Sequence, residues 1–168
     1  MKKINLKDIV IYASVAAIYV VLTWIFGAFS FGPIQLRISE VLVLLCFFNK
    51  KYFLPLTLGC FISNLMSPYS LDVLFGTVAT MISLFFICNC KNLFISSLFP
   101  VIFNGIIIAL EIAIMSGVFT FEVLLFNILT IAIGEFISVS IIGILLFSIL
   151  RKNQGFINLI TDIGQNKN

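Results

Sequence analysis

Hydrophobic residues fall into long runs along this 168-residue chain, and short polar stretches separate the runs. The runs cover residues 9–29, 38–48, 52–66, 71–88, 93–115 and 121–150. A helix needs about 20 apolar residues to cross a bilayer, which the first, fifth and sixth runs reach easily and the fourth nearly so. The second and third runs are short, but a re-entrant hairpin would bury Lys50 and Lys51 at membrane depth, which is unfavourable. The pattern therefore predicts an all-α membrane protein with a bundle of six transmembrane helices.

Composition agrees with lipid as the solvent of this chain. Hydrophobic residues make up 61% of it and charged residues 10%, with a mean hydropathy of +1.21, whereas soluble domains carry about 25% charged residues. The chain has no histidine, which excludes imidazole bases, Ser-His triads and His-ligated metals. It also has no GxxxxGK[ST] loop for hydrolysing ATP. We therefore expect no enzymatic activity, no metal and no cofactor.

Basic residues indicate the orientation. Nine of the ten fall on one side of the six predicted spans: Lys2, Lys3, Lys7, Lys50, Lys51, Lys91, Arg151, Lys152 and Lys167. The positive-inside rule makes that side cytoplasmic, so both termini are predicted to be cytoplasmic. The exception is Arg37, in the first outer loop. This placement accounts for the net charge of +3 without a nucleic-acid partner.

The chain is predicted to be one domain followed by a tail. Residues 1–150 form the six-helix transmembrane unit, which we expect to bind a substrate, and residues 151–168 form a polar cytoplasmic tail. The basic N-terminus and the first apolar run resemble a signal peptide, but the run is about 20 residues long and lacks a polar cleavage region. An uncleaved first span is therefore expected.

Acidic residues are the most informative polar positions. Five lie in or beside the outer parts of the predicted spans: Glu40, Asp72, Glu111, Glu122 and Glu135. Glu122 is expected at the membrane interface. Glu135 lies well inside the sixth run, where an acidic side chain costs roughly 2.5–3.5 kcal/mol near the bilayer centre. Its carboxyl group must therefore face protein or a watery cavity.

Helical spacing gathers the polar residues of several runs into stripes. The stripes are Ser97, Asn104 and Glu111; Asp72, Gly76 and Thr80; and Asn127, Gly134, Glu135 and Ser138. Such stripes are typical of hydrogen bonds that hold helices together in a membrane. For the stripes taken together we favour a second interpretation, a pocket that is open to the outside and lined by carboxylates, amides and aromatic rings.

The stretch FGPIQLRISE, residues 31–40, leads from the first outer loop into the second apolar run. Arg37 and Glu40 are one helical turn apart in it. One interpretation is an interfacial anchor with an ion pair. The other is a capture loop that runs into a helix and lines the mouth of the pocket.

The chain resembles the QueT family of substrate-binding S-components of energy-coupling factor (ECF) transporters. The resemblance runs from about residue 8 to residue 150 and rests on FGPIQLRISE, GCFISNL, DVLFGTVAT, FNG and IGE, in this order. It implies six helices with both ends inside, a transmembrane coupling subunit and two ATPase subunits as partners, and a place in the bacterial cytoplasmic membrane. It also implies that Ala13 and Ala17, in ASVAA, pack against the coupling subunit.

The substrate that the resemblance implies is a queuosine precursor: queuine or a 7-substituted 7-deazaguanine. Its guanine-like edge offers N–H donors to a carboxylate and a carbonyl to an amide. The candidate substrate-binding residues are Glu135 and Glu111 as carboxylates, Asn104 as the amide, Gln35, Arg37 and Glu40 at the mouth, and Asn64 and Asp72 opposite. The alternative function is an ion-coupled secondary transporter or channel that acts alone, although no inverted repeat is visible in the sequence.

Overall fold

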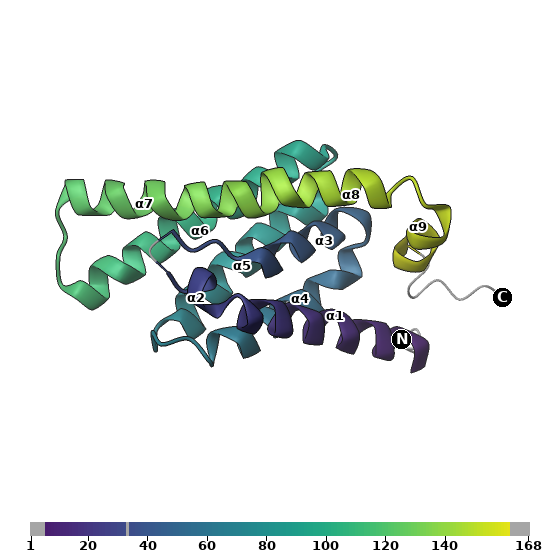
Figure 1. Ribbon diagram of the computed structural model, residues 1–168, viewed down its shortest axis with the longest axis horizontal. Coiled ribbons are helices and arrows are strands. Elements are labelled where there is room, and N and C mark those ends of the chain that lie inside the picture. Colours follow the sequence, from purple (N-terminus) through teal and green to yellow (C-terminus); the bar gives the residue numbers. More distant parts are fainter. Residues whose placement is uncertain (1–5, 33, 162–168) are drawn as a thin grey trace.

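The computed structural model describes residues 6–32 and 34–161, and all the regular structure in these residues is helical (Figure 1). η1 and η2 are 3-10 helices, and η3 is a π-helix. In chain order the elements are α1 (Leu6–Ile25), α2 (Gly27–Ser30), η1 (Ile38–Leu44), α3 (Leu45–Phe48), η2 (Lys50–Tyr52), α4 (Phe53–Asn64), α5 (Asp72–Asn89), α6 (Leu93–Ser116), α7 (Phe121–Glu135), η3 (Phe136–Gly143), α8 (Ile144–Leu150) and α9 (Gln154–Thr161).

Four helical segments of the described chain are long and apolar enough to cross a membrane. They are α1, α5, α6 and the continuous segment Phe121–Leu150, which joins α7, η3 and α8. The second apolar run forms only the short helix Ile38–Phe48, and α4 has 12 residues. The predicted all-α membrane class is confirmed, whereas the count of six transmembrane helices stays a prediction.

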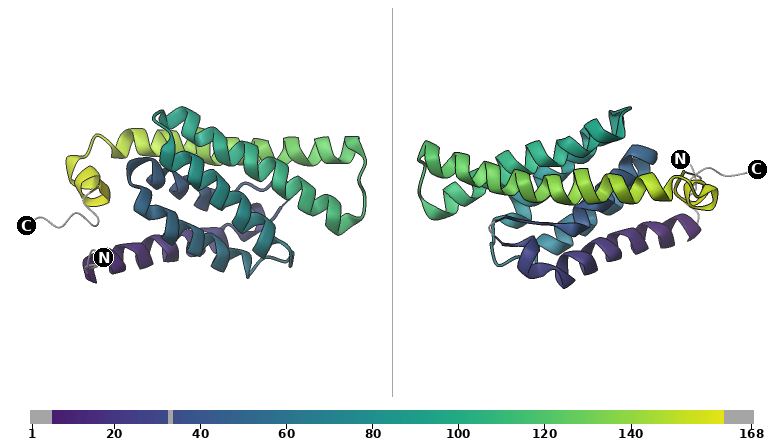
Figure 2. Two further views of the ribbon diagram at one scale, coloured as in Figure 1. Left: turned by 180° about the vertical axis from the view of Figure 1, so that it is seen from behind. Right: turned by 45° about the horizontal axis from the view of Figure 1, so that its top comes forward.

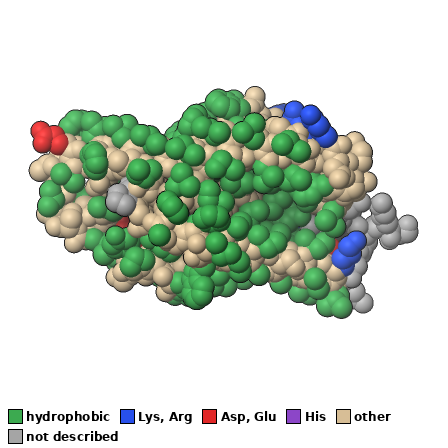
Figure 3. All heavy atoms as spheres, viewed as in Figure 1, with side chains coloured by type: hydrophobic (Ala, Val, Ile, Leu, Met, Phe, Trp, Pro, Cys, Tyr) green, Lys and Arg blue, Asp and Glu red, His purple; other side chains and the backbone are tan. Residues whose placement is uncertain are grey.

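The helices run back and forth between two ends of an elongated molecule (Figures 1 and 2). α1 begins at the end where α9 lies. Two contacts tie further segments to this end: Lys50 Nζ donates to Asn89 Oδ1 at 2.9 Å, and Asn49 Nδ2 donates to the Ile160 carbonyl at 3.2 Å. We call it the basic end, because the Lys and Arg side chains visible in Figure 3 gather toward it.

The opposite end, which we call the outer end, carries an exposed acidic side chain in the same view (Figure 3). The α6–α7 connection projects beyond the other connections at this end in every view (Figures 1 and 2). Of the basic residues used to predict the orientation, Lys2, Lys3 and Lys167 lie outside the described residues. The cytoplasmic location of the basic end therefore stays a prediction.

Apolar packing is concentrated toward the basic end. The main cluster of buried hydrophobic side chains includes Leu44, Leu56, Leu84 and Phe147, and Ile160 of α9 also belongs to it. A smaller cluster of Ile108, Ala109 and Ile131 joins α6 to α7. The space between these two clusters is occupied by polar side chains, and it is there that the candidate site lies.

Candidate ligand-binding site

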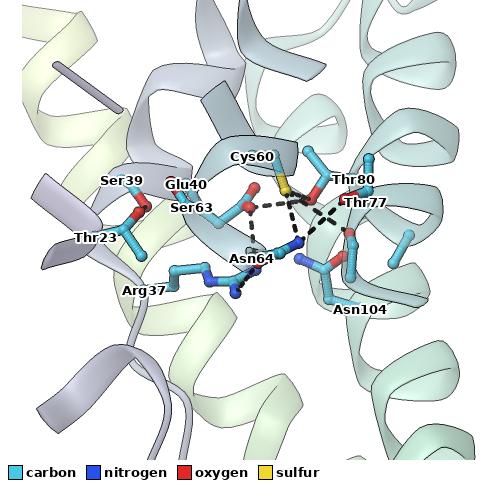
Figure 4. A network of polar contacts seen from close by, with 12 residues as sticks. Thr23, Arg37, Ser39, Glu40, Cys60, Ser63, Asn64, Thr77, Thr80 and Asn104 are labelled. Atoms are coloured by element: carbon cyan, nitrogen blue, oxygen red, sulfur yellow. Dashed lines mark hydrogen bonds and ion pairs between the residues drawn. The ribbon is translucent and has the colours of Figure 1, made fainter. Parts of the chain in front are cut away.

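All eight residues predicted to bind substrate are buried. None has more than 8% of its surface exposed: Gln35, Arg37, Glu40, Asn64, Asp72, Asn104, Glu111 and Glu135. Arg37 lies near enough to interact electrostatically with four buried carboxyl groups, those of Glu40, Asp72, Glu111 and Glu135. Residues from the helical stripes inferred from spacing therefore face one another in the interior. Figure 4 shows the part of this polar cluster around Arg37, Glu40 and Asn64.

Arg37 and Glu40 form the first half of this cluster, together with Asn64 of α4. Arg37 donates from Nη2 to Asn64 Oδ1 at 2.7 Å, and its Nη1 lies 4.0 Å from Glu40 Oε1. The guanidinium also lies over the Phe31 ring, 5.6 Å from its centroid. The Asn64 amide fits because α5 has Gly76 at the crossing, where a Cβ would come within 2.8 Å of Asn64 Nδ2.

Two other helices hold Glu40 in place. Tyr19 of α1 donates its hydroxyl to Glu40 Oε1, and Thr80 of α5 donates to the same oxygen at 3.1 Å. One helical turn along α1, Thr23 donates to Ser39 Oγ at 2.7 Å. The start of η1 is therefore bonded to α1 and α5 through side chains, as Figure 4 shows for Thr23, Ser39 and Thr80.

Asn104 and Glu135 form the second half, between α6 and α7. Asn104 Nδ2 donates to Glu135 Oε1 at 2.8 Å. Next to this bond, Asn104 Oδ1 and Glu135 Oε2 are buried and have no hydrogen-bond partner within the described protein. Two turns further along α6, both carboxyl oxygens of Glu111 are buried and unpartnered as well. Asp72 of α5 lies close enough to Glu111 for the two carboxyl groups to interact, and two ionised carboxylates repel each other.

The loop before η1 separates this cluster from the outer end. Its backbone lies directly on α7 at Gly134, where a Cβ would be 1.9 Å from the Ile34 carbonyl oxygen and 2.9 Å from that of Gln35. Gln35 has φ 46, in the left-handed region that residues other than glycine seldom adopt. The strained residue Gln35 therefore lies against α7 at Gly134, which immediately precedes Glu135 in the chain.

A pocket opens on the outer side of the loop. Its volume is about 440 Å³, and its lining is mostly apolar and aromatic: Phe31, Gly32, Gln35, Tyr69, Ile112, Met115, Ser116, Phe126 and Asn127. Ligand pockets of small molecules typically have 300–1,000 Å³ and a few polar groups among apolar walls. Asn127 Nδ2 is buried and has no partner within the described protein, so it is available to a ligand.

Chemically, the site is suited to binding a compound that donates several hydrogen bonds. Its free groups are mainly carboxyl and amide oxygens, which accept. Within the described residues, no three His, Cys, Asp or Glu side chains are grouped so that they could hold a metal ion.

Sequence reasoning missed several members of the site. Asn127 and Thr80 belong to stripes that the spacing predicts, but neither is among the predicted binding residues. Tyr19 and Thr80 donate hydrogen bonds to Glu40. The sequence around Tyr19 does not distinguish it from an ordinary core residue. Cys60 belongs to the main apolar cluster, and its sulfur also accepts from Asn64 Nδ2 at 3.4 Å, so it lies at the border between the apolar and polar clusters.

Ala13 and Ala17 lie apart from this site, exposed on α1. The inner side of the same helix packs closely on α4, since a Cβ at Gly59 would be 3.0 Å from Tyr19 Cβ and 3.1 Å from the Ala16 carbonyl oxygen. One side of α1 is thus fixed to the polar cluster, and the side with Ala13 and Ala17 is free.

Comparison with known proteins gives two matches. The family model of the QueT transporter matches residues 9–152. The queuosine precursor transporter QueT of Lactococcus lactis subsp. cremoris (strain MG1363) is 50% identical over 86 residues, which are 50% of this chain and 51% of that protein. The chain is thus matched to about half the length of this curated relative. No solved structure matches the chain.

Proposed function

The chain belongs to the QueT transporter family, and from that membership we propose that it captures a queuosine precursor from outside the cell for import. It is a multi-pass protein of the cell membrane. The proposed cargo is queuine or a 7-substituted 7-deazaguanine.

The structural observation that supports the proposal is the Asn104–Glu135 pair, which lies about two helical turns along α6 and α7 from the pocket residues Ile112 and Asn127. One oxygen of each side chain is buried without a partner within the described protein. A buried polar atom left unpaired costs about 1–3 kcal/mol, so a ligand that pairs with it recovers part of that energy on binding. Adjacent N–H groups on a guanine-like edge suit these acceptors, and a planar ring suits the aromatic pocket wall.

The other predicted binding residues have different roles in this proposal. Gln35, Arg37 and Glu40 belong to the capture loop and its helix, Asn64 fixes Arg37, and Asp72 and Glu111 face the outer side of the ligand. Because Glu40 and Asn64 already hold Arg37, the loop is preorganised, which reduces the entropy lost when a ligand binds.

We further propose that the protein is the S-component of an ECF importer, with six transmembrane helices and both termini in the cytoplasm. Residues 1–150 are the substrate-binding domain and residues 151–168 the cytoplasmic tail. Energy then comes from two separate ATPase subunits, which act through a transmembrane coupling subunit. The exposed position of Ala13 and Ala17 supports this, since close helix packing favours small residues.

Binding to the purified protein tests the capture function. Glu135→Gln keeps the shape of the side chain but puts an N–H group against the N–H groups of the ligand. Charge-assisted hydrogen bonds contribute roughly 1.5–3 kcal/mol, and 1.4 kcal/mol is a factor of ten in Kd. We expect calorimetry with a queuosine precursor to show at least tenfold weaker binding, whereas the exposed control Glu122→Gln binds like the wild type. Equal, tight binding by Glu135→Gln would remove Glu135 from the site.

Uptake by cells tests the ECF assembly. Uptake should disappear when the ECF coupling and ATPase subunits are deleted, and Ala13→Trp should abolish co-purification with the coupling subunit. Ile18→Trp is the matched control, because Ile18 is also exposed on α1 but lies about 100° round the helix from Ala17. Uptake that persists without those subunits would favour a transporter that acts alone.

A further inference from the structure

Two cysteine side chains from different elements meet toward the basic end. Cys46 of α3 is 1% exposed and belongs to the main apolar cluster, and Cys88 of α5 packs against this cluster. Their thiol groups are close enough for a hydrogen bond between them, and both cysteines are free. Two cysteines join in a disulfide without movement of the backbone only when their side chains already approach each other. Cys46 and Cys88 meet this condition.

The two thiols of the pair differ in their access to water. Cys88 is half-buried in the last turn of α5, whereas Cys46 is enclosed by the apolar cluster. Asn89, the next residue of α5, is exposed and accepts from the exposed Lys50, so this turn of the helix lies at the polar border of the molecule. A small reagent in the water at this end therefore reaches Cys88 first, and Cys46 waits behind it as the second thiol.

The two remaining cysteines have other partners. Cys60 is buried, and its thiol donates to Thr80 Oγ1 at 3.3 Å. Cys90 lies just after α5, and its thiol donates to the Asn92 carbonyl at 3.4 Å. Each of them thus makes a hydrogen bond to an oxygen atom, and the contact between two thiols belongs to Cys46 and Cys88.

We propose that Cys46 and Cys88 are a redox-sensitive pair, which hydrogen peroxide converts into a disulfide between α3 and α5. In the first step the Cys88 sulfur attacks one oxygen of the peroxide, the O–O bond breaks, and a sulfenic acid forms while one water leaves. In the second step the Cys46 sulfur attacks the Cys88 sulfur, the S–S bond forms, the S–O bond breaks, and a second water leaves. The two thiols lose two electrons and two protons, which the peroxide takes up.

Such a disulfide fixes a junction that is now held by hydrogen bonds alone. Directly after α3, Asn49 Nδ2 donates to the Ile160 carbonyl of α9, and Lys50 Nζ donates to Asn89 Oδ1 of α5. The disulfide adds a covalent link beside these bonds and closes the chain between positions 46 and 88 into a loop. Closing a loop lowers the entropy of the unfolded chain and so stabilises the folded protein. This property goes beyond the proposed function and needs no ligand.

Peptide mapping of the purified full-length protein tests the pair. The reduced protein is treated with hydrogen peroxide, its remaining thiols are alkylated after denaturation, and the digest is measured by mass spectrometry. We expect one linked pair of peptides, which contains Cys46 and Cys88 and which dithiothreitol separates, and we expect Cys60 to be alkylated. Any map without the link between Cys46 and Cys88, including one with Cys88 linked to Cys90, would overturn the proposal.

Two matched variants assign the effect on stability. Oxidation should raise the midpoint of thermal unfolding in detergent by about 5 °C or more for the wild type, and dithiothreitol should reverse the rise. Cys90→Ser removes the neighbouring thiol and should show the same rise. Cys46→Ser should show none, and its Cys88 should be trapped as a sulfenic acid by a dimedone probe. A rise of wild-type size in Cys46→Ser would contradict the proposal, and the map of the wild type does not depend on how either variant folds.

Discussion

Glu40 and Glu111 are both buried carboxyl groups of the same polar cluster, but the protein treats them differently. Glu40 accepts hydrogen bonds from α1 and α5 and lies beside Arg37. Glu111 has no hydrogen-bond partner within the described protein. The α6–α7 side, around Asn104, Glu111 and Glu135, is less fully bonded than the loop side around Arg37 and Glu40, although Arg37 Nε and Glu40 Oε2 are also buried without a partner within the described protein.

This difference gives a physical criterion for separating structural from ligand-binding residues. A buried charge whose partners belong to the protein is part of a network. Removing that charge leaves its partners unpaired, so the free energy of unfolding should fall. A buried group left without partners destabilises the fold, and in the proposed function a ligand supplies partners for those at the site. Variants on the loop side should therefore change stability first, and variants on the α6–α7 side should change binding first.

The largest expected effect is on the loop side. Arg37→Met removes the one guanidinium near four buried carboxyl groups, and breaking a buried ion pair from one side costs about 3–5 kcal/mol. We expect the free energy of unfolding of the protein in detergent to fall by about this amount. The double variant Arg37→Met with Glu40→Gln should recover much of the loss, because it removes both charges. Wild-type stability for Arg37→Met alone would show that the loop side is not a structural network.

The long helices and the polar faces of the candidate site were predictable from the sequence, because both depend on the periodicity of the helix. Runs of apolar residues predict the long helices, and i, i+4 or i, i+7 spacing predicts which side chains share a face, as with Asn104 and Glu111. An acid deep in an apolar run, such as Glu135, must be buried in protein. These inferences use only the geometry of one helix at a time.

Contacts between elements were not predictable in the same way. Arg37 and Asn64 are 27 positions apart in the chain, and Tyr19 and Glu40 are 21 apart. The helical period predicts which side chains share a face of one helix, but it does not predict which other helix that face contacts. The 3-10 conformation of η1 has no signal of its own in an apolar run. The contact of Ile34 with Gly134 depends on the path of an irregular loop, which spacing does not describe.

The next largest effect is expected where the two sides meet, at Gly134. Gly134→Ala places a methyl group 1.9 Å from the Ile34 carbonyl oxygen, so the loop has to move away from α7. Overpacking typically costs 1–3 kcal/mol, and we expect Kd for a queuosine precursor to rise about tenfold. Gly105→Ala is the matched control, since its nearest neighbour would be Ala132 Cβ at an ordinary 3.5 Å. Unchanged binding by Gly134→Ala would mean that the loop position does not matter for the ligand.

The smallest expected effect compares one hydroxyl from each side of the cluster. Thr23 donates to Ser39 Oγ, so Thr23→Val removes a hydrogen bond and leaves Ser39 with one partner fewer; the free energy of unfolding should fall by about 1 kcal/mol. Ser138 is buried in η3, and its hydroxyl has no partner within the described protein. Ser138→Ala should therefore leave stability unchanged or raise it slightly, because a buried polar atom without a partner is removed. Unfolding of both variants under the same conditions measures the difference, and equal losses would show that hydrogen-bond partners do not distinguish the two sides.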